Sequence, residues 1–392
     1  MKIKLLFVSI LIFQFCFSQN FISEWDNGFK IYSDDGNFKL KFGGRIMYDD
    51  AMWSTNFNGE DEFFYGSEFR RVRFFNSGQV YNNIKYKLQF DFAGGNISFK
   101  DVYIEIVDFF PYFGNIKVGH FKEPFRLEAL TSSKYITFME RALPIAFSPE
   151  RNVGVMFYNT FMDKRLSVQV GLFQQADTTF NVTETTDNRN ITSRITFLPI
   201  DNGDNVLHLG LAYSYRTNSD NTYKVETRPE SHMGNKLIST DIIEDVKNVT
   251  LMGTEIAFVM GALSIQGEYI TSSVWSNAHD DYNFSSYYSQ VSYFITGEKR
   301  NYKNSFAGFD RVKPNNNMGD DGFGALELAL RYSSMDLSEA DAGTLNDITV
   351  GLNWYLNPCT RVMFNYVMGT LEDHHGEETK ENTFQCRMQI DF

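Results

Sequence analysis

The segment IKYKLQFDF, residues 84–92, alternates apolar and polar side chains from its first residue to its last. Its apolar positions are Ile84, Tyr86, Leu88, Phe90 and Phe92, and its polar positions are Lys85, Lys87, Gln89 and Asp91. Successive side chains of a β-strand point to opposite faces of the sheet. The segment therefore predicts a strand with one apolar face and one polar face.

The same period of two recurs from residue 38 to the end of the chain. It predicts about sixteen strands, at 38–48, 67–78, 84–94, 98–108, 114–122, 152–159, 165–174, 190–198, 206–216, 250–259, 263–272, 286–296, 325–334, 346–357, 360–370 and 383–392. An even number of strands is typical of bacterial barrels made from one chain.

Composition favours a membrane barrel over a soluble domain. The chain has 38 Phe and 21 Tyr, so aromatic residues reach 16%, yet its mean hydropathy is −0.32. After residue 18 no run approaches the roughly 18 to 20 apolar residues of a membrane helix. An apolar outer band combined with a polar lumen accounts for both facts. The sequence thus predicts an all-β fold, a transmembrane antiparallel β-barrel of about sixteen strands.

Connection lengths follow the alternation of long external loops and short periplasmic turns that such barrels show. Residues 79–83, 160–164, 199–205, 261–262 and 357–358 form short turns, whereas 123–151, 175–189 and 217–249 are long. The connection 297–324 departs from this rule, since it is long on the side that should carry turns. Either the strand count is wrong there or the chain has a periplasmic insertion.

The N-terminus has the features of an export signal, because Lys2 and Lys4 precede an apolar run and the small residue Ser18. We expect residues 1–18 to be a signal peptide, 19–37 an N-terminal periplasmic segment and 38–392 the barrel. A lipoprotein signal ending at Cys16 is the alternative, but Phe15 stands where that signal needs a small residue.

The last ten residues, Thr383 to Phe392, alternate again and end on an aromatic side chain. Phe384, Cys386, Met388, Ile390 and Phe392 share one face. This ending resembles the C-terminal strand signal that the barrel assembly machinery recognises, with Phe392 as its final residue.

Several motifs resemble the phosphate-selective porin O/P family. They are Arg70-Arg71-Val72-Arg73, Gly119-His120-Phe121-Lys122-Glu123-Pro124-Phe125, Leu130-Thr131-Ser132-Ser133, Phe138-Met139-Glu140-Arg141, Gly324-Ala325-Leu326-Glu327-Leu328 and Gly351-Leu352-Asn353-Trp354-Tyr355. The resemblance implies a sixteen-stranded homotrimeric channel in the outer membrane of a Gram-negative bacterium, surrounded by outer-membrane lipid. It also implies that the loop after the fifth strand folds inward and narrows the pore.

In that inward loop, Ser132 or Ser133 could cap a short helix running to Ala142, with Pro144 and Pro149 ending it. Glu128, Glu140 and Arg141 would then lie in or near the constriction. The alternative is that Glu140 and Arg141 form an ion-paired anchor that holds the loop against the wall.

Bases outnumber acids on the predicted lumen face, although the whole chain has a formal charge of −13. The densest basic cluster is Arg71, Arg73, Lys85 and Lys87, and rings of Arg and Lys lower the barrier for anions. These bases are therefore candidates for anion attraction. The alternative is that they pair with Asp91, Asp101 and Glu105 on neighbouring strands.

The sequence shows no metal-type His spacing, no Gly-x-Ser-x-Gly elbow and no phosphate-cradling glycine loop. We therefore expect no enzyme activity, no cofactor, no metal site and no nucleic-acid partner. The interpretation that remains is a porin for passive diffusion of small solutes, with phosphate or other small anions as its partners. A non-selective general porin, or a barrel serving as envelope scaffold or adhesin, is the alternative.

Overall fold

The computed structural model describes residues 20–57, 60–110, 114–175, 189–217, 220–278, 280–319 and 322–392. The expected signal peptide and most of the 175–189 loop lie outside the described residues. Within these ranges, none of the helices has the length and apolar character needed to cross a membrane.

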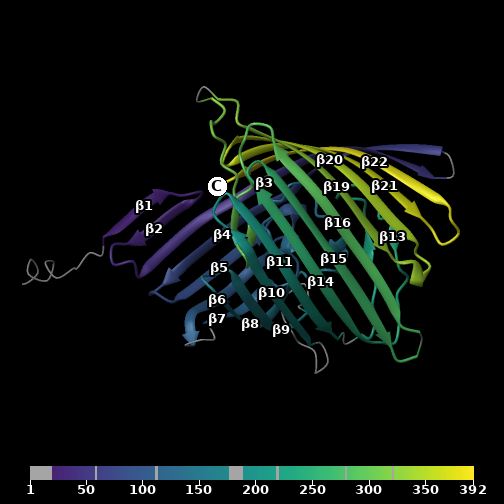
Figure 1. Cartoon of the computed structure of the whole chain (residues 1–392), viewed down its shortest axis with the longest axis horizontal. Helices are drawn as coiled ribbons and strands as arrows, with labels where there is room; N and C mark the ends of the chain where they lie inside the picture. Colours follow the sequence, from purple (N-terminus) through teal and green to yellow (C-terminus); the bar gives the residue numbers. More distant parts are fainter. Residues whose placement is uncertain are drawn as a thin grey trace, which may run out of the picture.

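Sixteen antiparallel strands close into a barrel, as the alternating sequence predicts (Figure 1). They are β3 (Phe38–Phe57), β4 (Glu60–Val80), β5 (Ile84–Asp91), β6 (Ser98–Phe110), β7 (Gly114–Lys122), β8 (Arg151–Phe161), β9 (Leu166–Gln174), β10 (Asn190–Asp201), β11 (Asn205–Arg216), β14 (Val246–Met260), β15 (Leu263–Ser276), β16 (Tyr282–Phe294), β19 (Ala325–Asp336), β20 (Thr344–Asn357), β21 (Thr360–Glu372) and β22 (Glu378–Asp391). Pairing of β22 with β3 closes the barrel.

The two faces of each strand differ as the sequence pattern predicts. In β11, Leu209 and Leu211 are exposed on the outer surface, whereas His208 and Ser214 are fully buried inside. In β22, Phe384, Met388 and Ile390 also face outward. The outer band is apolar because it contacts lipid, and the inner face is polar because it contacts water or inward-folded chain.

Two short strands precede the barrel. β1 (Phe21–Trp25) and β2 (Phe29–Ser33) form a hairpin, and β2 pairs with the first residues of β3. Figure 1 shows this hairpin projecting from the end of the barrel where β3 begins. The segment expected to precede the barrel therefore extends the sheet beyond the wall at the short-turn end.

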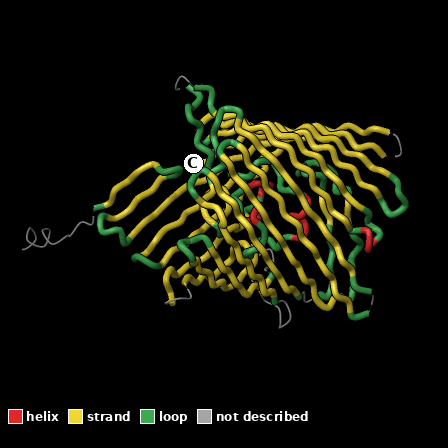
Figure 2. The backbone as a smooth tube through the Cα atoms, in the orientation of Figure 1, coloured by secondary structure: helices red, strands yellow, loops and turns green. Residues whose placement is uncertain are grey.

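Three segments fold into the lumen: residues 123–150, which we call the constriction loop, residues 220–245 and residues 300–311 of the long connection after β16. The constriction loop contains the helical turn α2 (Leu127–Leu130) and the 3-10 turn η3 (Leu143–Phe147), drawn in red within the barrel in Figure 2. The second segment carries β12 (Glu226–Thr227) and β13 (Ile238–Ser239). Turns η2 (Ala93–Gly95) and η4 (Ser338–Ala340) lie in other loops.

The predicted helix from Ser132 or Ser133 to Ala142 is wrong, since the helical turns lie on either side of it. Wall side chains bind the backbone of this stretch, which runs through turns and bends. Asn365 accepts a hydrogen bond from the Met139 amide at 3.1 Å, and Arg361 donates to the Ile136 carbonyl at 2.9 Å. Backbone groups bound to the wall are no longer available for helical hydrogen bonds.

The predicted count of sixteen wall strands is correct, so the long connection 295–324 is an insertion between β16 and β19 and not a missed pair of strands. It contains β17 (Tyr302–Asn304) and β18 (Gly308–Phe309), which form a small hairpin. Phe309 is buried, and its amide donates to Thr131 Oγ1 of the constriction loop at 3.4 Å. The insertion therefore enters the lumen from the short-turn end and contacts the constriction loop.

Candidate functional site

A chamber of about 530 Å³ lies between strands β3 to β9, the constriction loop and the tip of the insertion. Its lining is strongly basic. The bases are Arg45, Arg70, Arg71, Arg73, Lys87, Lys100, Lys117, Lys122, Arg141, Arg151 and Lys303, and the acids are Asp101 and Glu150. Cations in this excess attract and retain anions.

Two β-bulges concentrate the bases. The pairing of β3 with β4 passes from Met47 and Arg71 to Tyr48 and Phe69, so Arg70 is the additional residue. Arg70 and Arg71, although consecutive, therefore both line the chamber. A second bulge, in β6 opposite Leu88 to Phe90, does the same for Lys100 and Asp101.

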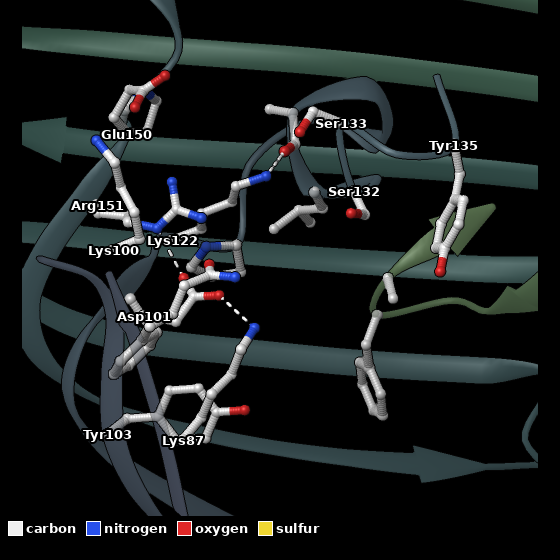
Figure 3. A pocket seen from close by; sticks show the side chains of 18 of the residues that line it. Lys87, Lys100, Asp101, Tyr103, Lys122, Ser132, Ser133, Tyr135, Glu150 and Arg151 are labelled. Carbon is white, nitrogen blue, oxygen red and sulfur yellow. Dashed lines mark hydrogen bonds and ion pairs between the residues drawn. The ribbon is translucent and has the colours of Figure 1, made fainter. Parts of the chain in front are cut away.

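Several of the bases are ion-paired across strands. Arg73 Nε is 2.6 Å from Asp91, Lys87 Nζ is 2.6 Å from Asp101, and Lys117 Nζ is 3.3 Å from Glu105. Arg151 Nε also donates to Asp101, at 2.7 Å (Figure 3). These pairs hold the side chains in place but neutralise part of the positive charge.

Five other chamber bases have no carboxylate within ion-pair distance in the described part of the chain: Arg45, Lys100, Lys122, Arg141 and Lys303. Neutral groups hold some of them. Arg45 donates to the Ser133 hydroxyl at 2.6 Å, and Arg141 donates to the carbonyls of Glu128 and Thr131, both at 2.9 Å. A hydroxyl or carbonyl partner orients a guanidinium without cancelling its charge.

The other half of the lumen is filled, and several of its charges form ion pairs. Arg194 binds Glu255 at 2.5 and 2.9 Å, and Arg387 binds Asp49 at 2.7 and 2.6 Å. Apolar side chains of residues 220–245, such as Val225 and Ile238, pack there against the wall. Within the described residues, Arg300 and Arg361 of this half also lack a carboxylate partner, but neutral groups such as Gln266 and the Ile136 carbonyl hold them.

The predicted basic cluster divides between two places. Arg71, Arg73 and Lys87 line the chamber. Lys85 is exposed near the short-turn end and is not part of the lining. Arg73 and Lys87 have the cross-strand acid partners that the alternative interpretation names, yet both also face the chamber.

The three predicted loop residues have different contacts. Glu140 accepts two hydrogen bonds from Arg70, at 2.8 and 2.9 Å, and one from Arg387 at 2.9 Å. Its partners are therefore wall arginines, not Arg141, which lines the chamber. Glu128 is buried and accepts from Arg126 at 2.9 Å and from Arg331 at 3.3 Å.

Phe392 lies where the barrel closes. Its carbonyl accepts a hydrogen bond from the Gly44 amide at 2.6 Å, and its amide donates to the Gly44 carbonyl at 3.2 Å. These bonds fix the last residue to the first strand of the wall.

Sequence reasoning did not identify Arg45, Lys100, Lys122, Arg151 and Lys303 as members of the site. Arg45 and Lys122 lie within quoted or predicted strands, so their strand position was a usable signal. Lys100 depends on a bulge, and Lys303 on the inward course of the insertion. Neither of those features leaves a recognisable pattern in one sequence.

A closed sixteen-stranded barrel with an apolar outer face and a loop folded into its lumen defines an outer-membrane porin, a non-enzymatic channel of Gram-negative bacteria. The chain belongs to the family of phosphate-selective porins O and P, whose model matches residues 39–392. It is 28% identical to Porin O of Pseudomonas aeruginosa over 93% of this chain and 91% of that protein. An uncharacterised Caulobacter vibrioides protein is also 28% identical, over 94% of this chain and 76% of its own length.

Solved porin structures share the fold. An anion-selective porin from Comamonas acidovorans has a TM-score of 0.58 at 14% identity, covering 90% of this chain and 100% of that one. The outer-membrane channel DcaP of Acinetobacter baumannii has a TM-score of 0.56 at 11% identity, covering 92% and 99%. A trimer form of OmpT from Vibrio cholerae has a TM-score of 0.52 at 12% identity, covering 91% and 99%.

Proposed function

We propose that the protein is an anion-selective porin that passes phosphate and other small anions by passive diffusion. The observation that supports this most directly is the chamber, in which eleven bases face two acids. Such a ring of cations lowers the electrostatic barrier for anions and raises it for cations. Membership of a phosphate-selective family supports phosphate as the solute.

The outer approach to the chamber has the same sign of charge. A second cavity of about 350 Å³, which we call the outer vestibule, is lined by Arg151, Arg216 and Lys224 and shares Pro149, Glu150 and Arg151 with the chamber. Anions entering from the long-loop end would meet positive charge before the constriction and after it. Fields of one sign along a low-dielectric passage raise the local concentration of the counter-ion.

The test is the reversal potential of the refolded protein in a planar bilayer across a KCl gradient, with inorganic phosphate then added. We expect a chloride-selective current that phosphate blocks. Lys100→Gln should weaken both effects, because Lys100 lines the chamber, and Lys85→Gln is the matched control outside it. A preference for cations would refute the proposal, and the absence of any preference would indicate a general porin. The absence of current from a correctly folded barrel would favour a scaffold.

We also propose a homotrimer. Within the described residues no strand pairs with the second edge of β4 from Glu60 to Arg71, and Phe63, Tyr65 and Phe69 are exposed there. An unpaired strand edge with large apolar side chains is a site for association with another chain. Mass measurement of the detergent-solubilised protein tests this, and a monomer would contradict it.

A further inference from the structure

Glu150 occupies a particular place on the anion route. It is the last residue of the constriction loop, directly before β8, and its carbonyl accepts the Glu123 amide at 3.2 Å. Together with Pro149 and Arg151 it lines both the chamber and the outer vestibule. Glu150 therefore lies at the boundary between the two cavities.

The two acids of the chamber differ in how they are held. Asp101 accepts hydrogen bonds from Lys87 at 2.6 Å and Arg151 at 2.7 Å. The Glu150 carboxylate accepts no hydrogen bond from any described residue and remains exposed inside the lumen. Figure 3 shows it beside Arg151, on the side away from Asp101. Asp101 is thus held by two bases, whereas the Glu150 carboxylate has no hydrogen-bond partner among the described residues.

Four bases act on the Glu150 carboxylate. Partial desolvation within the lumen favours its neutral form, but Arg151, Arg141, Lys122 and Lys100 more than offset this effect and hold the pKa of Glu150 below its ordinary value. Glu150 is therefore ionised at neutral pH. Three of these bases, Lys100, Lys122 and Arg141, are chamber bases without a carboxylate ion-pair partner in the described chain.

We propose that Glu150 is a tethered competitor: in the empty channel its carboxylate partly satisfies the bases that a passing anion must use, and so it sets how tightly anions are held. This inference rests on the proposed anion selectivity and concerns the same chamber. A channel conducts well only when its binding site is weak enough to release the ion. A carboxylate attached to the site weakens anion binding there without removing any cation.

The experiment compares wild type with Glu150→Gln, refolded and inserted in planar bilayers, using inorganic phosphate to block the chloride current. The substitution removes one negative charge from the cluster and preserves side-chain size. We expect the half-blocking phosphate concentration to fall roughly tenfold and the saturating current to fall as well, since bound anions leave more slowly.

Two variants serve as controls. Glu150→Asp keeps the charge, so its half-blocking phosphate concentration should equal that of the wild type. Glu377→Gln removes one negative charge from an exposed external loop, and its half-blocking phosphate concentration should also equal that of the wild type. Unchanged block in Glu150→Gln would overturn the inference, and so would weaker block, which would mean that the carboxylate helps to bind phosphate. Failure of anion preference in the wild type would instead refute the proposed function, so the two failures are distinguishable.

Discussion

Arg70 of β4 and Glu140 of the constriction loop are joined by two parallel hydrogen bonds, from Nε at 2.8 Å and from Nη2 at 2.9 Å. This bidentate geometry is the strongest arrangement that a guanidinium and a carboxylate can form. Arg387 of β22 reaches the same carboxylate at 2.9 Å. One loop carboxylate thus connects the constriction loop to two separate strands of the wall.

Loss of this connection should loosen the loop without opening the barrel. In Arg70→Ala, Glu140 keeps Arg387 but loses two charged hydrogen bonds, which costs roughly 2 kcal/mol. We expect greater open-channel noise and faster cleavage of the loop by protease, with an unchanged yield of folded barrel. Lys85→Ala is the control, since Lys85 is exposed outside the chamber. Open-channel noise equal to that of the wild type in Arg70→Ala would show that the other contacts suffice to hold the loop.

The insertion should contribute to conduction through Lys303. Its tip is held in the lumen, because the Ser305 carbonyl accepts a hydrogen bond from Arg194 at 2.7 Å. In Lys303→Gln the anion current at low salt should fall about twofold, the effect of one charge removed roughly 10 Å away through water. Lys313→Gln is the matched control, because Lys313 is an exposed base of the same segment that does not line the chamber. Equal effects of the two variants would remove Lys303 from the conduction route.

The architecture could be predicted from sequence because the side chains of a strand alternate between two faces with a period of two residues, and the barrel consists of many such strands. Each of the sixteen predicted segments overlaps one observed strand of the wall. The site could be predicted only where that period holds. Arg71, Arg73 and Lys87 keep the alternation and lie in the chamber, whereas Arg70 and Lys100 face inward because bulges interrupt it.

The inward loops were harder to predict for a different reason. Their conformation depends on partners that are distant in sequence, such as Asn365, which accepts from Met139, or Arg194, which donates to Ser305. Nothing within residues 131–142 indicates that wall side chains would take up its backbone groups. The local signals at Ser132 and Pro144 therefore suggested a helix that tertiary contacts exclude.

Closure of the barrel gives a prediction for assembly. A side chain added at Gly44 would place its Cβ 2.6 Å from the Arg73 carbonyl oxygen and 2.7 Å from the Phe392 ring, so Gly44→Val should obstruct pairing of β3 with the chain end. Phe392→Ala should also lower the fraction of folded barrel, because it removes the terminal ring. Phe384→Ala removes an outward ring from the same strand and serves as the control. The measurement is heat-modifiable electrophoretic mobility, and equal yields for the two Phe variants would deny Phe392 any special role.

The last prediction concerns pH. Burial lowers the pKa of Lys134, in the constriction loop, to about 8, against the opposing effect of Asp391, which lies 3.0 Å away. Arg45 and Arg311 also act to lower it. Since a lysine loses its charge as pH rises through its pKa, the lumen should lose one positive charge between pH 7 and 9, and anion preference should decrease. Lys134 binds its proton more weakly in the folded state than in the unfolded chain, where the pKa of a lysine is about 10.4. The free energy of unfolding should therefore rise as the pH increases from about 8 to 10.4.

Lys134→Arg separates this residue from other titrating groups, because arginine remains charged throughout that range. The reversal potential of the variant should shift less from pH 7 to 9 than that of the wild type, which should move toward cation preference. Arg311, which also binds Asp391, is unchanged in both proteins and keeps the insertion attached. If the variant retains the wild-type pH dependence, a group other than Lys134 is titrating, and the pKa assigned to this buried ammonium does not control the current.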